Sequence, residues 1–318
     1  MTPLKSGDIL DHYRLEALVA RSGMACIYRA TDLRTGRQCA IKVPHPEAES
    51  DVTFFERFHR EAQICRELDH PSVLKVMDEE DQSRVYMVME WVEGRLLREV
   101  LAEEGPLSPE RAARIAIAIC TALDHIHSRG VVHRDLKPEN VIIGSGDSVK
   151  LIDFGIAQRA GARRLTFGKF SNIMGTAEYI SPEQVKGKRG DARSDLYALG
   201  IMLYEMLTGE TPFDGPNPLA IMNARLAAAP VRPGDIVPGL SPQLDSIVSR
   251  ALEYNPGSRY ASALEFARDL EHQDQVAVAR SSEKARQNPL PKKVLFYGAL
   301  AALPITIFGL LLYVARMA

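Results

Sequence analysis

This 318-residue sequence has little cysteine and tryptophan, and neither basic nor acidic residues are in clear excess. Its only cysteines are Cys26, Cys39, Cys65 and Cys120. They are scattered and form no CxxC pair, which argues against a disulfide framework or a zinc site and favours a reducing compartment. The 39 basic and 41 acidic residues nearly cancel, so no electrostatic footprint for nucleic acid is present. The first ten residues lack an apolar segment, and we expect no secretory signal peptide.

Long apolar runs are also rare, with one exception at 294–314, where 21 consecutive residues carry no charge. At about 1.5 Å per residue this segment spans roughly 31 Å, the thickness of a bilayer core. We therefore expect a transmembrane helix, the alternative being a buried core helix. The polar linker before it, 273–293, has five basic and two acidic residues, which places the preceding chain on the cytoplasmic side of the cell (inner) membrane. Residues 315–318 would form a short extracytoplasmic tail.

The remaining chain, about residues 9–272, changes its hydrophobic pattern once. Apolar and polar residues alternate at 28–30, 39–43 and 85–89, which predicts strands, and one amphipathic segment at 54–68 interrupts them. From Ser108 onward helical spacing dominates. Ser108 suits an N-cap, Pro109 the first helical position and Gly130 the end of that helix. We predict an α+β fold of two lobes: a small antiparallel sheet with one helix at about 9–92, and a larger helical lobe at about 93–272.

Six short motifs follow one another in this region. The strongest is HRDLKPEN at 133–140, followed by Asp-Phe-Gly at 153–155. The others are Ala-Ile-Lys at 40–42, a segment running from Gly175 to Glu183, a segment at 194–200, and Arg259. In order and spacing they resemble the bacterial eukaryotic-like (Hanks-type) serine/threonine protein kinases, over about four fifths of the chain. The resemblance implies the bilobal kinase fold, ATP and Mg²⁺ as cofactors (with Mn²⁺ as an alternative), and protein substrates.

The resemblance also implies a role for each residue of the motifs. Lys42 would hold the α- and β-phosphates, and Glu61 would pair with Lys42. Asp135 would accept the proton of the substrate hydroxyl, and Lys137 would neutralise the γ-phosphate. The remaining roles fall to three residues: Asn140 and Asp153 would bind the metal, which prefers hard oxygen ligands, and Thr176 would order the site through Asp135 and Lys137. Arg259 would pair with Glu183.

The nucleotide base would lie between apolar side chains and a backbone hinge. The resemblance places the gatekeeper at Met89 and adenine hydrogen bonds at the backbone of Glu90 and Val92. The residues that would sandwich the ring are Val19, Ile27, Ala40 and Ile142. Each could equally be ordinary core, and the two interpretations coexist because adenine would complete that core.

The glycine-rich loop departs from the family pattern, because its three signature glycines are replaced by Ala20, Ser22 and Ala25. Gly23, followed by Met24, is an extra glycine. Small side chains still let backbone amides approach phosphate, but they lose the positive-φ freedom of glycine. A pseudokinase or nucleotide-binding scaffold with weak or no transfer is therefore the alternative function. A mainly structural membrane protein is a third, which the intact catalytic loop disfavours.

The segment between Asp153 and Glu183 is basic, with no acidic residue between Phe154 and Ala177. A phosphate on Thr166 or Ser171 would supply negative charge and bridge Arg134 to this segment. We therefore expect autophosphorylation there, between two copies of the chain and so with a possible dimer. The alternative is that the basic segment recruits acidic substrates.

Overall fold

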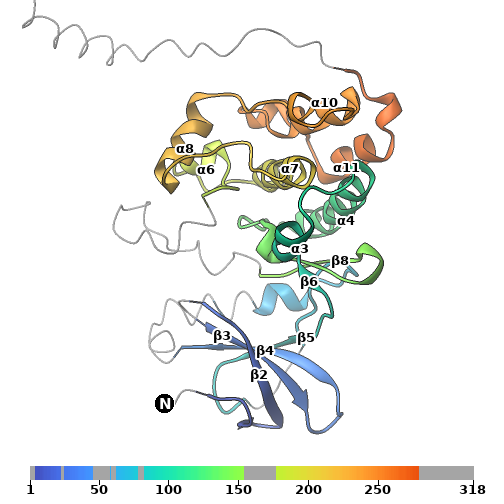
Figure 1. Ribbon diagram of the computed structural model, residues 1–318. Helices are drawn as coiled ribbons and strands as arrows, with labels where there is room; N and C mark the ends of the chain where they lie inside the picture. The colour runs from blue at the N-terminus through green and yellow to red at the C-terminus, as the bar shows by residue number, and fades with distance from the viewer. Residues whose placement is uncertain are drawn as a thin grey trace, which may run out of the picture. The chain divides into compact units, whose positions relative to one another are not determined.

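The computed structural model of the chain describes residues 4–22, 25–45, 58, 62–77, 82–153 and 177–278. Its N-terminal part is a five-stranded antiparallel sheet in which each strand pairs with the next along the chain (Figure 1). The strands are β1 (Ile9–Leu10), β2 (Tyr13–Arg21), β3 (Ala25–Asp32), β4 (Gln38–Pro44) and β5 (Met87–Glu90). Of the predicted amphipathic segment at 54–68, the structure describes 58 and 62–68, and of these 58 and 62–66 are helical. The small sheet-rich lobe is thus confirmed.

The two faces of this sheet have different neighbours. One face buries a small apolar core that includes Tyr13, Leu15 and Ile41. On the other face Ile27 is paired directly with Lys42, and Ala40 with Met89. Paired residues on neighbouring strands share a face. The strand register therefore gathers the lysine and three of the residues expected near the nucleotide on one side.

The larger lobe is mainly helical, as predicted, but it also holds a small antiparallel sheet in the order β6-β7-β8, which was not predicted. Its strands are β6 (Arg95–Leu96), β7 (Val141–Ile143) and β8 (Val149–Leu151). Its α-helices are α3 (Leu97–Glu104), α4 (Pro109–Ser128), α6 (Pro182–Val185), α7 (Ala192–Thr208), α8 (Pro218–Ala227), α9 (Pro233–Ile236), α10 (Pro242–Ala251) and α11 (Ala263–Glu271). Short 3-10 turns are η1 (Pro138–Asn140), η2 (Ser145–Asp147), η4 (Pro256–Ser258) and η5 (Gln273–Gln275).

Helix α4 begins as its sequence predicts. The hydroxyl of Ser108 accepts a hydrogen bond from the backbone N–H of Arg111 (3.3 Å), and Pro109 occupies the first helical position. Beyond the helix, Gly130 adopts φ +73°, a left-handed conformation that glycine tolerates without strain. The start and the end of α4 are thus encoded locally.

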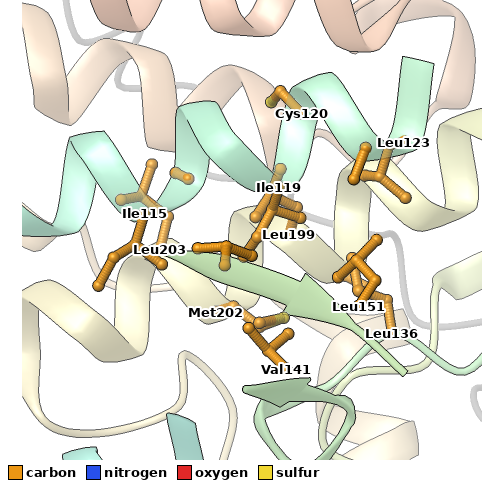
Figure 2. Close-up of a cluster of buried hydrophobic side chains, with 14 of the residues drawn as sticks. Ile115, Ile119, Cys120, Leu123, Leu136, Val141, Leu151, Leu199, Met202 and Leu203 are labelled. Atoms are coloured by element: carbon orange, nitrogen blue, oxygen red, sulfur yellow. The ribbon is translucent and has the colours of Figure 1, made fainter. Parts of the chain in front are cut away.

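The core of the larger lobe lies between α4, α7 and the small sheet. Figure 2 shows Ile119 and Leu123 of α4 gathered with Leu199 of α7. Val141 of β7 and Leu151 of β8 close the cluster (Figure 2). Truncating one such buried side chain to alanine typically costs about 2–5 kcal/mol of stability. This core therefore fixes β7, which follows the catalytic loop, and β8, which precedes Asp153.

The C-terminal predictions fall mostly outside the described residues. The turn η5 and the packing of Val276 against the core extend the folded part a few residues past 272. Within the part of the chain that the structure describes, no helix combines the length and the apolar character needed to cross a bilayer. The predicted span at 294–314 and the rest of the linker lie beyond that part, and so do Gly23, Met24, Glu61, Thr176, Thr166 and Ser171.

Candidate active site

Three of the predicted catalytic side chains meet in the loop between α4 and β7. Asp135 is 7% exposed. Its Oδ2 lies 3.2 Å from Nζ of Lys137. The side-chain amide of Asn140 donates to the backbone oxygen of Asp135 (2.7 Å) and lies 3.4 Å from Oδ2. The turn η1 carries Asn140 back toward Asp135, so a carboxylate, an ammonium and an amide converge within six residues of chain.

The backbone of this loop is held in an unusual conformation by a buried carboxylate. Arg134 has φ +64°, a region that side-chain-bearing residues seldom occupy. Asp195, 1% exposed near the start of α7, accepts hydrogen bonds from the backbone N–H groups of His133 (2.8 Å) and Arg134 (2.7 Å). The side chain of Gln184 reaches the carbonyl of Arg134 (3.4 Å). Such strain persists where the surroundings enforce it, and here Asp195 holds the two backbone N–H groups directly before Asp135.

Lys42 of the small sheet and Asp153 of the larger lobe form an ion pair, with Nζ to Oδ1 at 2.9 Å. The charge of Lys42 is the main cause that lowers the pKa of Asp153 below its ordinary value. Asp153 itself has φ +50°, a second strained residue beside the catalytic loop. The structure thus brings together the predicted phosphate-binding lysine and the predicted metal ligand. The expected partner Glu61 lies outside the described residues.

The donor set fits a hard divalent cation. Asn140 uses its amide nitrogen as the donor to Asp135, which leaves the amide oxygen as a ligand atom. Asp153 is kept ionised by Lys42. Mg²⁺ prefers oxygen ligands and is usually held by one or two protein groups together with phosphates and water. Asn140 and Asp153 meet that requirement.

The residues expected around adenine come from both sheets. Ala40 and Met89 are buried, Ile27 is half-buried, and Ile142 lies half-buried on β7. Val19 on β2 is 52% exposed, a large apolar side chain that a bound ring would cover.

The predicted hinge after β5 is fixed through Glu90. The N–H of Glu90 donates to the carbonyl of Lys75 (3.0 Å). The carboxylate accepts from the N–H of Lys75 (2.9 Å) and from Nζ of Lys150 (2.5 Å). Val92, the other predicted hinge residue, is half-buried against the core. The backbone that would read adenine is therefore anchored from β5 onward.

The altered glycine-rich loop closes through Ser22. Its N–H donates to the carbonyl of Ala25 (2.9 Å), and its hydroxyl bonds both the carbonyl and the N–H of Ala25 (3.1 Å each). The carbonyl of Ser22 also contacts Nε2 of His45 at 2.9 Å. The sequence analysis missed His45, whose position after β4 carries no motif. Ala20, the other replacement, is an exposed residue of β2.

The predicted pair of Glu183 and Arg259 is confirmed. Both guanidinium nitrogens, Nη1 and Nη2, bond the carboxylate at 2.9 Å, and the hydroxyl of Ser194 adds a bond of 2.6 Å. Burial by itself would raise the pKa of Glu183. The hydrogen bonds from Arg259 and Ser194 and the charge of Arg259 outweigh it and lower the pKa to about 2. This pair fixes the start of α6, directly after residues 177–181.

Two further arginines act near the site and were not predicted. Arg98 on α3 donates to Glu139 of the catalytic loop (2.9 Å), to Glu205 of α7 (2.6 Å) and to the hydroxyl of Tyr179. These contacts raise the pKa of Arg98 against the opposing effect of burial. The other is Arg225 on α8. A charged residue on the buried face of an apolar helix, beside Ile221 and Met222, was the signal that the sequence offered for it.

Comparison with known proteins agrees with this geometry. Residues 13–272 match the protein kinase domain family. A probable serine/threonine-protein kinase of Corynebacterium efficiens is 41% identical over 290 residues, which cover 88% of this chain and 44% of the relative. Serine/threonine-protein kinase PknB of Mycolicibacterium smegmatis is 40% identical over 265 residues, covering 82% of this chain and 42% of the relative. The chain thus spans less than half the length of these relatives.

A solved structure is similar as well. The crystal structure of the Mycobacterium tuberculosis PknI kinase domain superposes with a TM-score of 0.67 at 28% sequence identity. The match covers 86% of this chain and 100% of the PknI domain. The bilobal architecture therefore agrees with an experimentally determined kinase domain.

Proposed function

The chain belongs to the protein kinase family, its kinase domain is of the serine/threonine kind, and on that premise we propose that it transfers the γ-phosphate of ATP to serine and threonine hydroxyls of proteins. One observation carries the proposal. Lys42 of the small lobe pairs with Asp153 of the larger lobe, and the residue before Asp153, Ile152, donates its N–H to the carbonyl of Asn140 (2.9 Å) in the loop where Asp135, Lys137 and Asn140 converge. Fold stability alone requires no such gathering of charges, whereas phosphoryl transfer depends on positioning and charge neutralisation.

Each side chain has a task in that reaction. Asp135 accepts the proton of the attacking hydroxyl, and its direction is set by Asp195 through the backbone of His133 and Arg134. Lys137, within 3.2 Å of Asp135, is placed to neutralise the transferred phosphoryl group. Lys42 orients the phosphates that remain on the nucleotide.

Asn140 and Asp153 would hold Mg²⁺, which supplies neutralisation of phosphate charge when it is bound. Asp153 serves this role only while ionised, and the charge of Lys42 keeps it so by lowering its pKa. The amide of Asn140 is fixed by its bond to the Asp135 backbone, so the metal ligand and the proton acceptor are positioned by one contact.

The alternative is a nucleotide-binding scaffold with weak or no transfer, motivated by the replaced glycines. The contacts of Ser22 with Ala25 favour the active enzyme, because they hold the ends of β2 and β3 together where signature glycines are replaced. The positions that carry chemistry, Lys42, Asp135, Asn140 and Asp153, are all present.

We further propose that the kinase is anchored in the cell membrane by residues 294–314, with its catalytic domain on the cytoplasmic side. We also propose that it phosphorylates Thr166 or Ser171 of a second copy. The uncharged run and the basic linker support the first proposal, and the basic, acid-free segment at 154–176 supports the second. The requirement for cytoplasmic ATP agrees with that orientation.

Phosphate transfer from γ-³²P-ATP tests the function, with detergent-solubilised full-length protein and casein as the acceptor. Asp135→Asn is the control, and we expect it to lose about 10²–10⁴-fold in kcat while MgATP binding survives. Equal rates for the two proteins would refute the role of Asp135, and no transfer with intact MgATP binding would establish the scaffold. Mass spectrometry of the wild type decides between Thr166, Ser171 and neither.

A further inference from the structure

Arg225 is the largest fully buried side chain described in this protein, at 1% exposure, and no motif assigns it a role. It lies on α8, far along the chain from the catalytic loop. Nη1 donates to the carbonyl of Ala177 (2.7 Å) and Nη2 to the carbonyl of Glu178 (2.5 Å). One planar guanidinium thus grips two consecutive peptide groups, a contact that a single ammonium cannot reproduce.

The surroundings of Arg225 hold it in place without a carboxylate. Its guanidinium lies 5.2 Å from the ring centre of Phe213, and among the described residues its Nε has no hydrogen-bond partner. Among the described residues no carboxylate lies within ion-pair distance of it. Burying a charge in this way is costly, and the main compensation here is the pair of backbone carbonyls. The buried cation of Arg225 therefore serves to fix two peptide groups.

The segment that Arg225 grips is connected to the catalytic loop from its other side. Tyr179 contacts Arg98, which in turn bonds Glu139, one residue before Asn140. Ser181 is the N-cap of α6, and the side chain of Gln184 of α6 reaches the carbonyl of Arg134 next to Asp135. Residues 177–181 thus form a wall beside the loop that must receive an acceptor hydroxyl.

We propose that Arg225 is a positioning residue for the protein substrate: by fixing the carbonyls of Ala177 and Glu178 it sets the wall against which the acceptor polypeptide binds. This inference rests on the proposed kinase function. It concerns the acceptor side alone, because no contact of Arg225 involves Lys42, Asp153 or the residues expected around adenine. Loss of Arg225 should weaken acceptor binding and leave the nucleotide side unchanged.

Steady-state kinetics of the full-length protein with casein separate these effects. In Arg225→Met we expect KM for casein to rise about tenfold, the loss that follows from two buried carbonyls left without donors. KM for ATP and the rate of ATP hydrolysis without acceptor should stay within about twofold. Arg225→Lys, which keeps the charge and one donor direction, should recover part of the casein KM.

Arg250→Met is the control for losing an arginine elsewhere in the larger lobe. Arg250 likewise stacks on a ring, that of Tyr260 at 4.1 Å, and bonds carboxylates on α11, but it does not contact residues 177–181. We expect its casein KM to match the wild type. An unchanged casein KM in Arg225→Met, or equal rises for casein and ATP, would overturn the inference.

Amide hydrogen exchange decides the positioning claim independently of activity. Peptides covering 177–181 should exchange faster in Arg225→Met than in the wild type and in Arg250→Met. Equal exchange in all three proteins would refute the claim. A wild type that transfers no phosphate would refute the proposed function alone, because the exchange comparison stands without turnover.

Discussion

Replacing Glu183 with glutamine should cost the kinase domain on the order of 3 kcal/mol of unfolding free energy at neutral pH. The pKa of Glu183 lies at about 2, against an ordinary 4.5. At about 1.4 kcal/mol per pH unit between folded and unfolded pKa, the ionised carboxylate contributes roughly that amount. Removing one partner of a buried pair typically costs about 3–5 kcal/mol, which agrees. The Arg259 side chain is fully buried, so solvent cannot replace the lost partner.

The effect has a defined pH window. The folded pKa of Glu183 is lowered, so its stabilisation is fully present above about pH 4.5 and is lost as the pH falls through about 2. The difference in stability between wild type and Glu183→Gln should therefore be constant from pH 7 to about pH 5. It should then shrink on further acidification.

Urea unfolding of a 1–278 fragment, followed by far-UV circular dichroism at several pH values, measures this difference. In thermal unfolding of the same fragment at neutral pH, the Tm of the variant should be about 6–12 °C lower. The double variant Glu183→Gln with Arg259→Met should be only partly restored, because Arg259 also bonds the carbonyls of Glu253, Tyr254 and Arg193. A neutral-pH loss below about 1 kcal/mol, or a difference that does not change down to pH 3, would refute the reasoning.

Three further predictions concern the site and the membrane. Lys42→Met removes the charge that lowers the pKa of Asp153, so the affinity for MgATP, measured by calorimetry, should fall. As the pH is lowered, Asp153 of the variant should become protonated sooner, so the variant should lose MgATP binding at a higher pH than the wild type does. Asp195→Asn replaces an acceptor of two backbone N–H groups with an amide, which should lower stability by about 1–3 kcal/mol and reduce kcat more than KM for ATP. Full-length protein should sediment with membranes and a 1–278 fragment should not; full-length protein recovered without detergent would refute the span at 294–314.

Much of the fold could be predicted because its signals are local. Alternation over two residues marked the strands at 28–30 and 39–43, and Ser108 and Pro109 marked the start of α4 within one turn. The catalytic loop was equally readable, since Asp135, Lys137 and Asn140 lie within six residues and their side chains meet through one short turn.

A contact between two residues far apart in the sequence was predictable only where both residues belong to recognised motifs. Glu183 and Arg259 are 76 positions apart, and their pairing followed from the family resemblance. His45 and Arg98 belong to no motif, and their contacts with Ser22 and with Glu139 and Glu205 arise from the packing of separate elements. Periodicity carries no information about which carbonyl or carboxylate such a side chain will reach.

The sequence by itself determined the two-lobe order of strands and helices and the identity of the chemical groups, because backbone preference and side-chain chemistry are properties of short segments. Only the tertiary structure decided which groups act on one another. Asp195 lies about 60 residues after the loop that it holds strained, and Arg225 lies 48 residues after the Ala177 carbonyl that it fixes. Burial makes such contacts valuable, since an unpaired buried polar group is costly, and burial exists only after the chain has folded.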